Sequence, residues 1–298
     1  MIYIMTALYQ EAKPILKHLE LKRIPTRTGL EIYEGRIPYP GKITEKIEND
    51  GAPIRLVITG TGVIAAAAAT AASLSDVRGG EQDFLINWGS CAAERGDLLE
   101  GYLANQLIST MDQKTYYPDL LFKTGWKEAC VITEPGVWNQ STHHASDRVI
   151  LHDMEAAAIY YAASFFLAPH QMLFAKVVTD FGMEKAEAES DAMKKKCAEM
   201  MERAYPRLET LLQSLSEFLM EESASDGWEE PEELNILYQE FCCSETMKAD
   251  LRKQIHYWIL AQVDYQAEME KLRLAGELPC RDRREGKKRI EQLKKTLF

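Results

Sequence analysis

Short apolar runs alternate with helix-forming or turn-forming segments through the first 180 residues of the chain. The runs are rich in β-branched side chains and are bounded by Gly, Pro or polar residues, which is typical of buried strands. They predict strands over residues 2–7, 30–37, 54–59, 84–88, 103–109, 129–133, 149–152 and 172–179. Residues 63–74 and 154–167 are alanine-rich and lack Gly and Pro, so we expect two tightly packed helices there. This succession of strands and helices predicts an α/β fold.

The pattern changes after residue 182, where helix-forming residues follow one another with little interruption. Residues 217–233 carry eight acids and no base, which indicates a linker or a solvated helix end. One or two amphipathic helices are expected over residues 234–274. We therefore place a domain boundary near Asp226, between a domain over residues 1–225 and a helical C-terminal extension over residues 226–298.

The composition is that of a globular protein, since 46% of the 298 residues are hydrophobic and 27% are charged. The net charge of −11 argues against a general nucleic-acid binder, which needs a basic surface. No apolar run reaches the roughly 18 residues that span a bilayer, and the first 14 residues lack the basic region and cleavage site of a signal peptide. The six cysteines have no C-x-x-C spacing, which predicts reduced thiols in a cytoplasmic protein.

The last 18 residues depart from this acidic balance, with eight bases and three acids. One interpretation is a tail that binds nucleic acid. The other is a solvated amphipathic helix in which Ile290, Leu293 and Leu297 pack on the chain's own acidic segment. The second is favoured, because the negative charge elsewhere in the chain would repel phosphates.

Residues 60–65, with the sequence GTGVIA, follow a predicted strand and open a predicted helix. The pattern matches the glycine fingerprint of dinucleotide-binding domains. In that motif the next strand ends in an acidic residue that binds the ribose, whereas here it ends in Asn87-Trp88-Gly89. A tight turn beside a ligand is therefore the better interpretation of the two glycines.

Small residues close the strand that ends near Gly89, with the sequence Ser90-Cys91-Ala92-Ala93. Small side chains at the carboxyl end of a strand let a ligand approach the backbone, and open α/β sheets bind ligands at such ends. Ser90 could form a hydrogen bond there, but the G-x-S-x-G pattern of a nucleophile elbow is absent. Cys91 is expected to be a small packed residue.

Three carboxylates lie in apolar surroundings: Glu11 just past the first strand, Glu155 within HDMEAAAIYYA and Asp180 at the end of FAKVVTD. Each of them taken alone is explained as a helix cap or a turn residue. Taken together, they would converge on one crevice at the ends of parallel strands. Carboxylates in different environments can supply an acid and a base at neutral pH.

The histidines His143, His144 and His152 raise the question of a metal site. Two adjacent histidines share neither a helix face nor a strand face, and no Asp, Glu or Cys completes a ligand spacing. A loop or surface position is expected for them, and no metal ion is predicted.

These motifs, in this order, resemble the purine nucleoside phosphorylase and nucleosidase superfamily, most closely its 5′-methylthioadenosine/S-adenosylhomocysteine nucleosidases. The similarity covers roughly residues 1–215 and rests on MIYIMTALYQEAKPI, VITGTGVIAAAAA, LINWGSCAAERGDLL, HDMEAAAI and VVTDFG. It implies a three-layer α/β domain around a central twisted mixed sheet, a homodimer and no cofactor. About residues 226–298 the resemblance is silent.

The resemblance also implies roles for individual residues. Glu11 would activate the attacking water, and Asp180 would act as general acid at N7 of the leaving purine. Glu155 would hold the ribose hydroxyls. The other residues assigned to substrate binding are Ser90, Val137, Trp138, Met154, Lys176 and Thr179.

The chain departs from the family pattern at several positions. Lys176 stands where the family's nucleosidases have an arginine, so the bidentate fork is lost. Trp88 replaces a usually smaller residue, and residues 134–139, aligned with the base-stacking loop, are unusual. Phosphorylases of the superfamily place an arginine at the position of Asn87 and another in a glycine-rich first loop, and residues 6–13 offer neither feature.

Three functions remain open on this reasoning. The preferred one is hydrolysis of the N-glycosidic bond of an adenine-type nucleoside through an oxocarbenium-like transition state. The second is a phosphate-dependent phosphorylase on the same fold. The third is a nucleoside-binding or interaction protein without catalysis, whose helical extension is the working part. In each case the small-molecule partner is a purine nucleoside, with no membrane and no nucleic-acid partner expected.

Overall fold

The structure is a computed structural model that describes residues 1–26, 28–38, 51–75, 83–121, 124–140, 143, 147–225, 233–261 and 263–296. The chain divides into two compact units, Met1–Glu222 and Ser223–Phe298. Within the described residues, no helix is both long enough and apolar enough to cross a membrane. The assignment of a catalytic role to the first unit stays a prediction.

The first unit is built on one mixed sheet of ten strands, in the order β10-β6-β8-β9-β5-β1-β4-β3-β2, with β7 beside β6. An additional pairing of β5 with β10 closes β5, β10, β6, β8 and β9 into a ring. The strands are β1 (Ile2–Thr6), β2 (Lys22–Ile24), β3 (Glu31–Ile37), β4 (Ala52–Ile58), β5 (Phe84–Ala93), β6 (Gly101–Ser109), β7 (Thr115–Tyr116), β8 (Lys127–Thr133), β9 (Ile150–Asp153) and β10 (Met172–Asp180).

In the middle of the sheet, β1 pairs in parallel with β4 and with β5, and β5 pairs in parallel with β10. Where β5 meets β10, the register shifts between Val178, which is opposite Cys91, and Asp180, which is opposite Ala92. Thr179 is therefore an extra residue, a bulge at the end of the strand.

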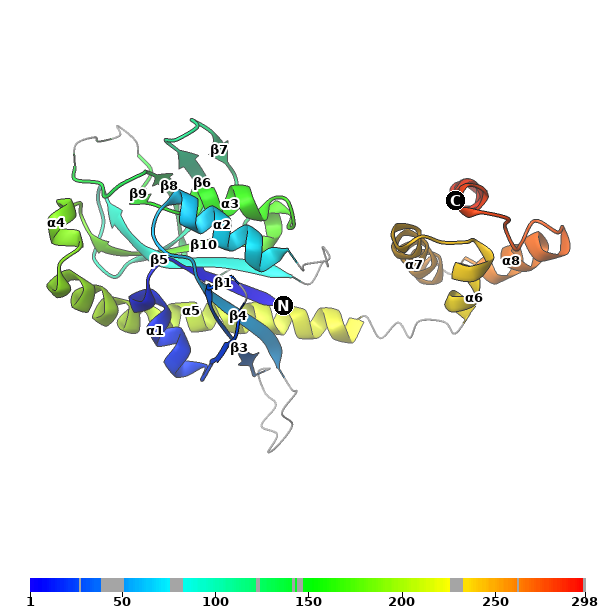
Figure 1. Ribbon diagram of the computed structural model, residues 1–298, viewed down its shortest axis with the longest axis horizontal. Coiled ribbons are helices and arrows are strands. Elements are labelled where there is room, and N and C mark those ends of the chain that lie inside the picture. The colour runs from blue at the N-terminus through cyan, green and yellow to red at the C-terminus, as the bar shows by residue number, and fades with distance from the viewer. Residues whose placement is uncertain are drawn as a thin grey trace. The chain divides into compact units, whose positions relative to one another are not determined.

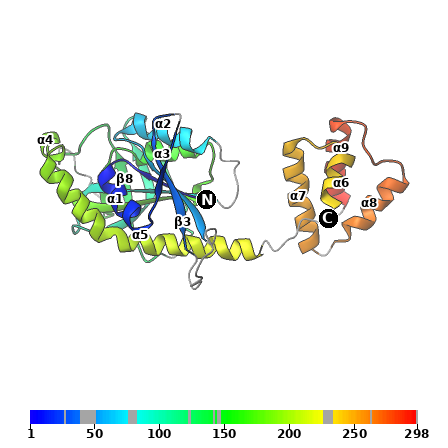
Figure 2. The same ribbon diagram turned by 60° about the horizontal axis from the view of Figure 1, so that its bottom comes forward.

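Helices cover both faces of this sheet (Figures 1 and 2). Ile2 and Ile4 of β1 pack toward α1 and α5, whereas Tyr3 and Met5 pack toward α2 and α3, as the two-residue period of a strand requires. The predicted three-layer α/β arrangement with a mixed sheet is confirmed. The helices are α1 (Tyr9–His18), α2 (Val63–Leu74), α3 (Ala156–Ala163), the 3₁₀ turn η1 (Pro169–Gln171), α4 (Lys185–Ala188) and α5 (Asp191–Ser225).

Two details of the first unit differ from the sequence-based expectation. The helix expected over residues 154–167 is confined to Ala156–Ala163, because Glu155 adopts a non-helical backbone at its N-cap (φ −136°, ψ −33°). Strand β5 runs on to Ala93 instead of ending at Trp88, because β9 and β10 pair with its last residues.

The second unit consists of α6 (Glu233–Glu240), α7 (Glu245–Leu260), α8 (Tyr265–Leu274) and α9 (Arg283–Thr296), with a core of its own that includes Phe241 and Trp258. Residues 234–274 thus form three helices, not the expected one or two. A turn at Cys242, with φ +48°, and the N-caps Ser244 and Asp264 start new helices.

The basic tail forms α9, and its apolar face is buried, with Ile290 and Leu293 each 3% exposed in the core of this unit. Leu297 lies outside the described residues. The acidic partners of α9 include Asp250 of α7, whose carboxylate lies 2.7 Å from Lys294 Nζ, and Glu277, which forms an ion pair with Arg289.

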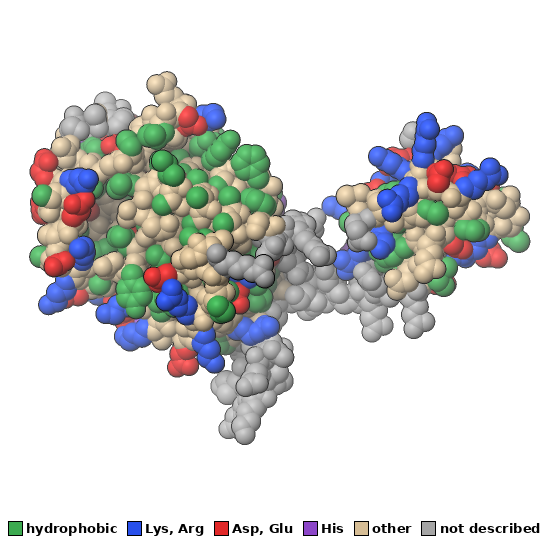
Figure 3. Space-filling view, in the orientation of Figure 1, with side chains coloured by type: hydrophobic (Ala, Val, Ile, Leu, Met, Phe, Trp, Pro, Cys, Tyr) green, Lys and Arg blue, Asp and Glu red, His purple; other side chains and the backbone are tan. Residues whose placement is uncertain are grey.

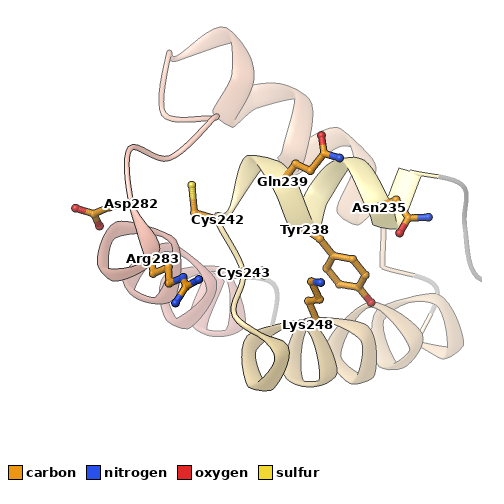
Figure 4. Close-up of a pocket in the computed structure, with 8 residues that line it drawn as sticks. All are labelled: Asn235, Tyr238, Gln239, Cys242, Cys243, Lys248, Asp282 and Arg283. Atoms are coloured by element: carbon orange, nitrogen blue, oxygen red, sulfur yellow. The ribbon is translucent and has the colours of Figure 1, made fainter.

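A cavity of about 710 Å³ opens in the second unit between α6, the start of α7 and the start of α9 (Figure 4). Its lining combines Lys248 and Arg283 with two amides, and Lys248 Nζ lies 5.8 Å from the centre of the Tyr238 ring. The residues predicted to carry chemistry lie elsewhere, in the first unit.

Candidate functional site

A second cavity, of about 490 Å³, lies at the carboxyl ends of the parallel strands of the first unit. Its size is within the usual range for small-molecule sites, about 300–1,000 Å³. The predicted site residues that line it are Glu11, Ser90, Val137, Trp138, Met154, Glu155, Thr179 and Asp180. Lys176 is not part of the lining; it is buried beside the cavity, 1% exposed.

Glu11 is fixed by four hydrogen bonds in the first turn of α1. The backbone N–H groups of Ala7 and Leu8 each donate to Oε2 at 3.0 Å. On the other oxygen, the N–H and the hydroxyl of Ser90 both donate to Oε1 at 2.7 Å. Because Ser90 lies in β5, these bonds join the first helix to the middle of the sheet, and the carboxylate is 2% exposed.

Glu155 is the N-cap of α3, and its Oε1 accepts a hydrogen bond of 2.7 Å from Gly62 N–H. Gly62 has φ +90°, a conformation that favours glycine, so the turn of residues 60–65 presents its backbone to the carboxylate. Burial, and then the nearby charge of Asp153, raise the pKa of Glu155 to about 7. The glycine turn therefore supports a side chain of the cavity, as the turn interpretation expected.

Asp180 follows the bulge at the end of β10. Gly182 N–H donates to its Oδ1 at 2.9 Å, and the Thr179 hydroxyl donates to its Oδ2 at 3.1 Å. Burial raises the pKa of Asp180 despite these bonds. A raised pKa moves a carboxyl group toward the range in which a general acid works.

Lys176 and Asp153 form a buried ion pair of 2.7 Å, with both side chains 1% exposed. Burial lowers the pKa of Lys176, but attraction to Asp153 and Glu155 outweighs it, and the pKa lies above its ordinary value. Asp153 also accepts hydrogen bonds from the Thr133 hydroxyl and Ala156 N–H. Sequence reasoning missed Asp153, although an acid at the end of the apolar run 149–152 was a usable signal.

Gly89 allows Glu11 and Lys176 to approach the same point of β5. A Cβ on Gly89 would lie 3.3 Å from Glu11 Oε1 and 3.5 Å from Lys176 Nζ. The glycine is thus needed because two charged side chains occupy the space that a larger residue would fill.

The structure corrects the expectation for His152 and answers a question about Trp88 that the sequence left open. His152 is not on a loop or at the surface: it lies in β9, is 3% exposed and lines the cavity. Trp88 does not narrow the cavity, because its side chain packs in the core on the α5 side, with the Trp126 ring 6.3 Å away. Alternation along β5 explains the position of Trp88, since Trp88 and Gly89 point to opposite faces.

Two buried cysteines lie at the cavity. Cys91 is packed as expected, and burial raises its pKa well above the ordinary value. Cys197 enters the lining from α5, and burial raises its pKa to about 12. Both thiols are thus poor nucleophiles near neutral pH.

No protein-family model and no curated protein matches the chain. Solved structures do. S-adenosylhomocysteine nucleosidase from Streptococcus pyogenes, in complex with 5-methylthiotubericidin, superposes with a TM-score of 0.56 at 20% identity, over 72% of this chain and 96% of that one. The chain has the nucleosidase fold.

Two further structures agree on this fold. The 5′-methylthioadenosine/S-adenosylhomocysteine nucleosidase from Neisseria meningitidis, in complex with methylthio-immucillin-A, gives a TM-score of 0.54 at 16% identity, over 72% of this chain and 98% of that one. A futalosine hydrolase mutant from Helicobacter pylori gives a TM-score of 0.51 at 14% identity, over 70% of this chain and 97% of that one. The predicted resemblance to the nucleoside phosphorylase and nucleosidase superfamily is thus confirmed for the fold, which carries more than one substrate among these structures.

Proposed function

We propose that this chain hydrolyses the N-glycosidic bond of a purine nucleoside of the adenine type, such as 5′-methylthioadenosine or S-adenosylhomocysteine. The observation that carries the proposal is the convergence of Glu11, Glu155 and Asp180 on one nucleoside-sized cavity. The three carboxyl groups have different surroundings, which is what separate acid, base and binding roles require. The nucleosidase fold of the chain supports the same activity.

Asp180 is the proposed general acid. Burial raises its pKa above the ordinary value of the carboxyl group, and a proton placed on N7 of the purine makes the base a better leaving group. The hydrogen bonds from Thr179 and Gly182 fix the carboxyl group at the end of β10. Val137 and Trp138 form the wall for the base.

Glu155, with Met154 beside it, is proposed to bind the ribose. Positive charge builds on the sugar as the bond to the base breaks, and the ribose hydroxyls become more acidic. A carboxylate that accepts their hydrogen bonds therefore binds the transition state more strongly than the ground state. The Gly62 N–H holds one oxygen of Glu155 in place and leaves the other for the sugar.

Glu11 is proposed to activate the water. All four of its acceptor positions are filled by Ala7, Leu8 and the two donors of Ser90. Among these donors, only the Ser90 hydroxyl can rotate away without moving the backbone. A water would take its place on Oε1, with the hydroxyl free to bond to the water in turn.

The charges around Glu11 support water over phosphate as the nucleophile. Lys176 is neutralised by Asp153, and the Asn87 amide donates to the Met5 carbonyl and not into the cavity. An incoming phosphate dianion would meet Glu11 and Glu155. Lys185 and Lys194 also line the cavity, from α4 and α5, and each already forms an ion pair with a carboxylate of its own segment.

The deciding experiment measures release of free base from purine nucleosides with and without inorganic phosphate. We expect release without phosphate and the same rate with it. Phosphate dependence would instead indicate a phosphorylase, and tight binding without release would indicate a nucleoside-binding protein.

The same assay on Asp180→Asn tests the acid. We expect a folded protein with turnover reduced roughly 10²–10⁴-fold, the usual contribution of a general acid, and with little change in KM. Asp191→Asn is the matched control, because the Asp191 side chain is 99% exposed. Near wild-type turnover in folded Asp180→Asn would remove the assignment.

A further inference from the structure

His152 occupies an unusual place for a histidine, in the apolar strand β9 with its side chain only 1% exposed. Its Nδ1 lies 2.9 Å from Glu134 Oε1, and its Nε2 lies 3.1 Å from Glu94 Oε1. Glu94 directly follows β5, and Glu134 directly follows β8. Two strand ends therefore clamp one imidazole ring from both sides.

The two carboxylates determine the protonation that satisfies this arrangement. An ionised carboxylate only accepts hydrogen bonds, so both ring nitrogens must donate for both bonds to form. That pattern of two donors is the one an imidazolium offers. Among the described residues, His143 also lies near this cluster, with its Nδ1 3.9 Å from Glu94 Oε2.

Trp138 lies flat on the His152 ring. The ring centroids are 4.1 Å apart, the planes are within 2° of parallel, and Trp138 is 4% exposed. A cation held over the face of an indole is attracted to it, most strongly where water is excluded. The imidazole ring, held at both nitrogens, thus gives the indole a surface of fixed orientation on which to stack.

Trp138 in turn packs on the turn that follows Asp180. A Cβ on Gly182 would lie 2.9 Å from Trp138 Cε3, so the backbone there contacts the indole closely. Met183 N–H donates to the Trp138 carbonyl, and the Gln140 amide donates to the Phe181 carbonyl. Because Gly182 N–H also holds Asp180, contacts run without a break from His152 to the proposed acid.

We propose that His152 is a positioning residue, which as an imidazolium clamped by Glu94 and Glu134 holds Trp138 against the Asp180 turn and so keeps the acid in place. This inference rests on the proposed function for the reaction that it serves. The arrangement of His152, Trp138 and Gly182 itself can be tested apart from any activity.

The test is a double-mutant cycle, in which kcat and KM are measured for four proteins. These are wild type, His152→Gln, Trp138→Phe and the double variant His152→Gln/Trp138→Phe. His152→Gln should lower kcat roughly 10²-fold, the cost of misplacing a catalytic group by about 1 Å, and should also raise KM, because Trp138 forms part of the wall for the base. If His152 acts through Trp138, the effects of the two substitutions on kcat will be strongly non-additive. Independent, additive effects would overturn the proposal.

His18→Gln is the matched control. His18 also stacks on an aromatic ring, that of Tyr205 at 4.3 Å, and also contacts a carboxylate, Glu202, but it lies in α1 away from the cavity. Its replacement should leave kcat unchanged.

Nitrogen-15 NMR of labelled histidine supplies the readout that does not depend on activity. Wild type should show one imidazolium with two N–H protons that disappears in His152→Gln, and the Trp138 indole resonance should shift in the same variant. A neutral His152, or an unmoved Trp138 resonance, would overturn the proposal. If wild type releases no base, the proposed function fails, while the NMR result still decides whether His152 positions Trp138.

Discussion

Glu155 combines a buried carboxyl group with a neighbouring negative charge, and this links folding stability to pH. Its pKa in the folded protein is about 7, against an ordinary value of 4.5. Between these two pH values the folded state keeps a proton that the unfolded state has lost. The contribution of Glu155 to stability is therefore complete below pH 4.5 and is lost as the pH rises to about 7.

Glu155→Gln should remove this dependence, because the amide stays neutral and can still accept the hydrogen bond from Gly62. We expect the variant to melt at a higher temperature than wild type at pH 8, with the difference shrinking toward pH 5. Base release should fall, since an amide binds the cationic transition state less well. A thermal midpoint below that of wild type at pH 8 would contradict the linkage.

Gly89→Ala tests the space shared by Glu11 and Lys176. The added methyl group would lie 3.3 Å from Glu11 Oε1, so the carboxylate must move while the strand stays paired. We expect base release to fall at least tenfold, with a stability loss of about 1 kcal/mol, typical of point substitutions. Gly136→Ala is the control, because nothing lies within 4 Å of its added methyl group although Gly136 also lines the cavity.

The sequence predicted Glu11, Glu155 and Asp180 because each stands at the end of a recognisable strand or at the start of a helix. It did not predict the partners that distinguish them. The Lys176–Asp153 pair and the His152 clamp join strands whose residues are far apart along the chain. Such contacts follow from strand order, which single-sequence patterns do not determine.

At the scale of elements, the buried Lys176–Asp153 pair joins β10 to β9. Removing one partner leaves the other charge buried alone, which costs about 3–5 kcal/mol. We expect Lys176→Met to lose this much unfolding free energy in urea and Lys176→Met/Asp153→Leu to recover most of it. Lys185→Met is the control, because Lys185 and its ion-pair partner Glu189 are 77% and 67% exposed. This substitution should change the free energy of unfolding by less than about 1 kcal/mol. Equal losses in the single and double variants would contradict an isolated charge as the cause.

Elements were predictable where one pattern dominated. Helix α2 matches its predicted bounds because its alanine-rich sequence has no competing signal. Helix α1 was not predicted: it contains Pro14, which removes a backbone donor from a helix interior. Strands β2 and β7 have three and two residues, too few for a period to be recognised.

At the scale of the whole molecule, the two units have separate hydrophobic cores. We therefore expect a protein truncated after Glu222 to fold and to release base within a few-fold of the full-length rate. Calorimetry of the full chain should show two transitions, one of which is lost on truncation. Failure of the shorter protein to fold would show that the first unit needs the second.

The homodimer stays a prediction, and an apolar surface on the first unit suits it. Ile64, Tyr161 and Phe165, in α2, in α3 and just after α3, are 82%, 46% and 70% exposed. Figure 3 shows hydrophobic side chains gathered on this part of the surface. Exposed apolar patches of this kind mark interaction sites. Light scattering should give twice the mass of the chain, and Phe165→Glu should give a monomer, whereas a monomeric wild type would exclude the dimer.

The bulge at Thr179 adds a residue to β10 without changing how the strand pairs. Val178 lies opposite Cys91 and Asp180 lies opposite Ala92, so two residues of β10 correspond to one step along β5. From this extra position the Thr179 hydroxyl donates to Asp180 Oδ2. A single inserted codon can therefore give the end of a strand a new hydrogen-bond donor while the paired residues on either side keep their faces of the sheet.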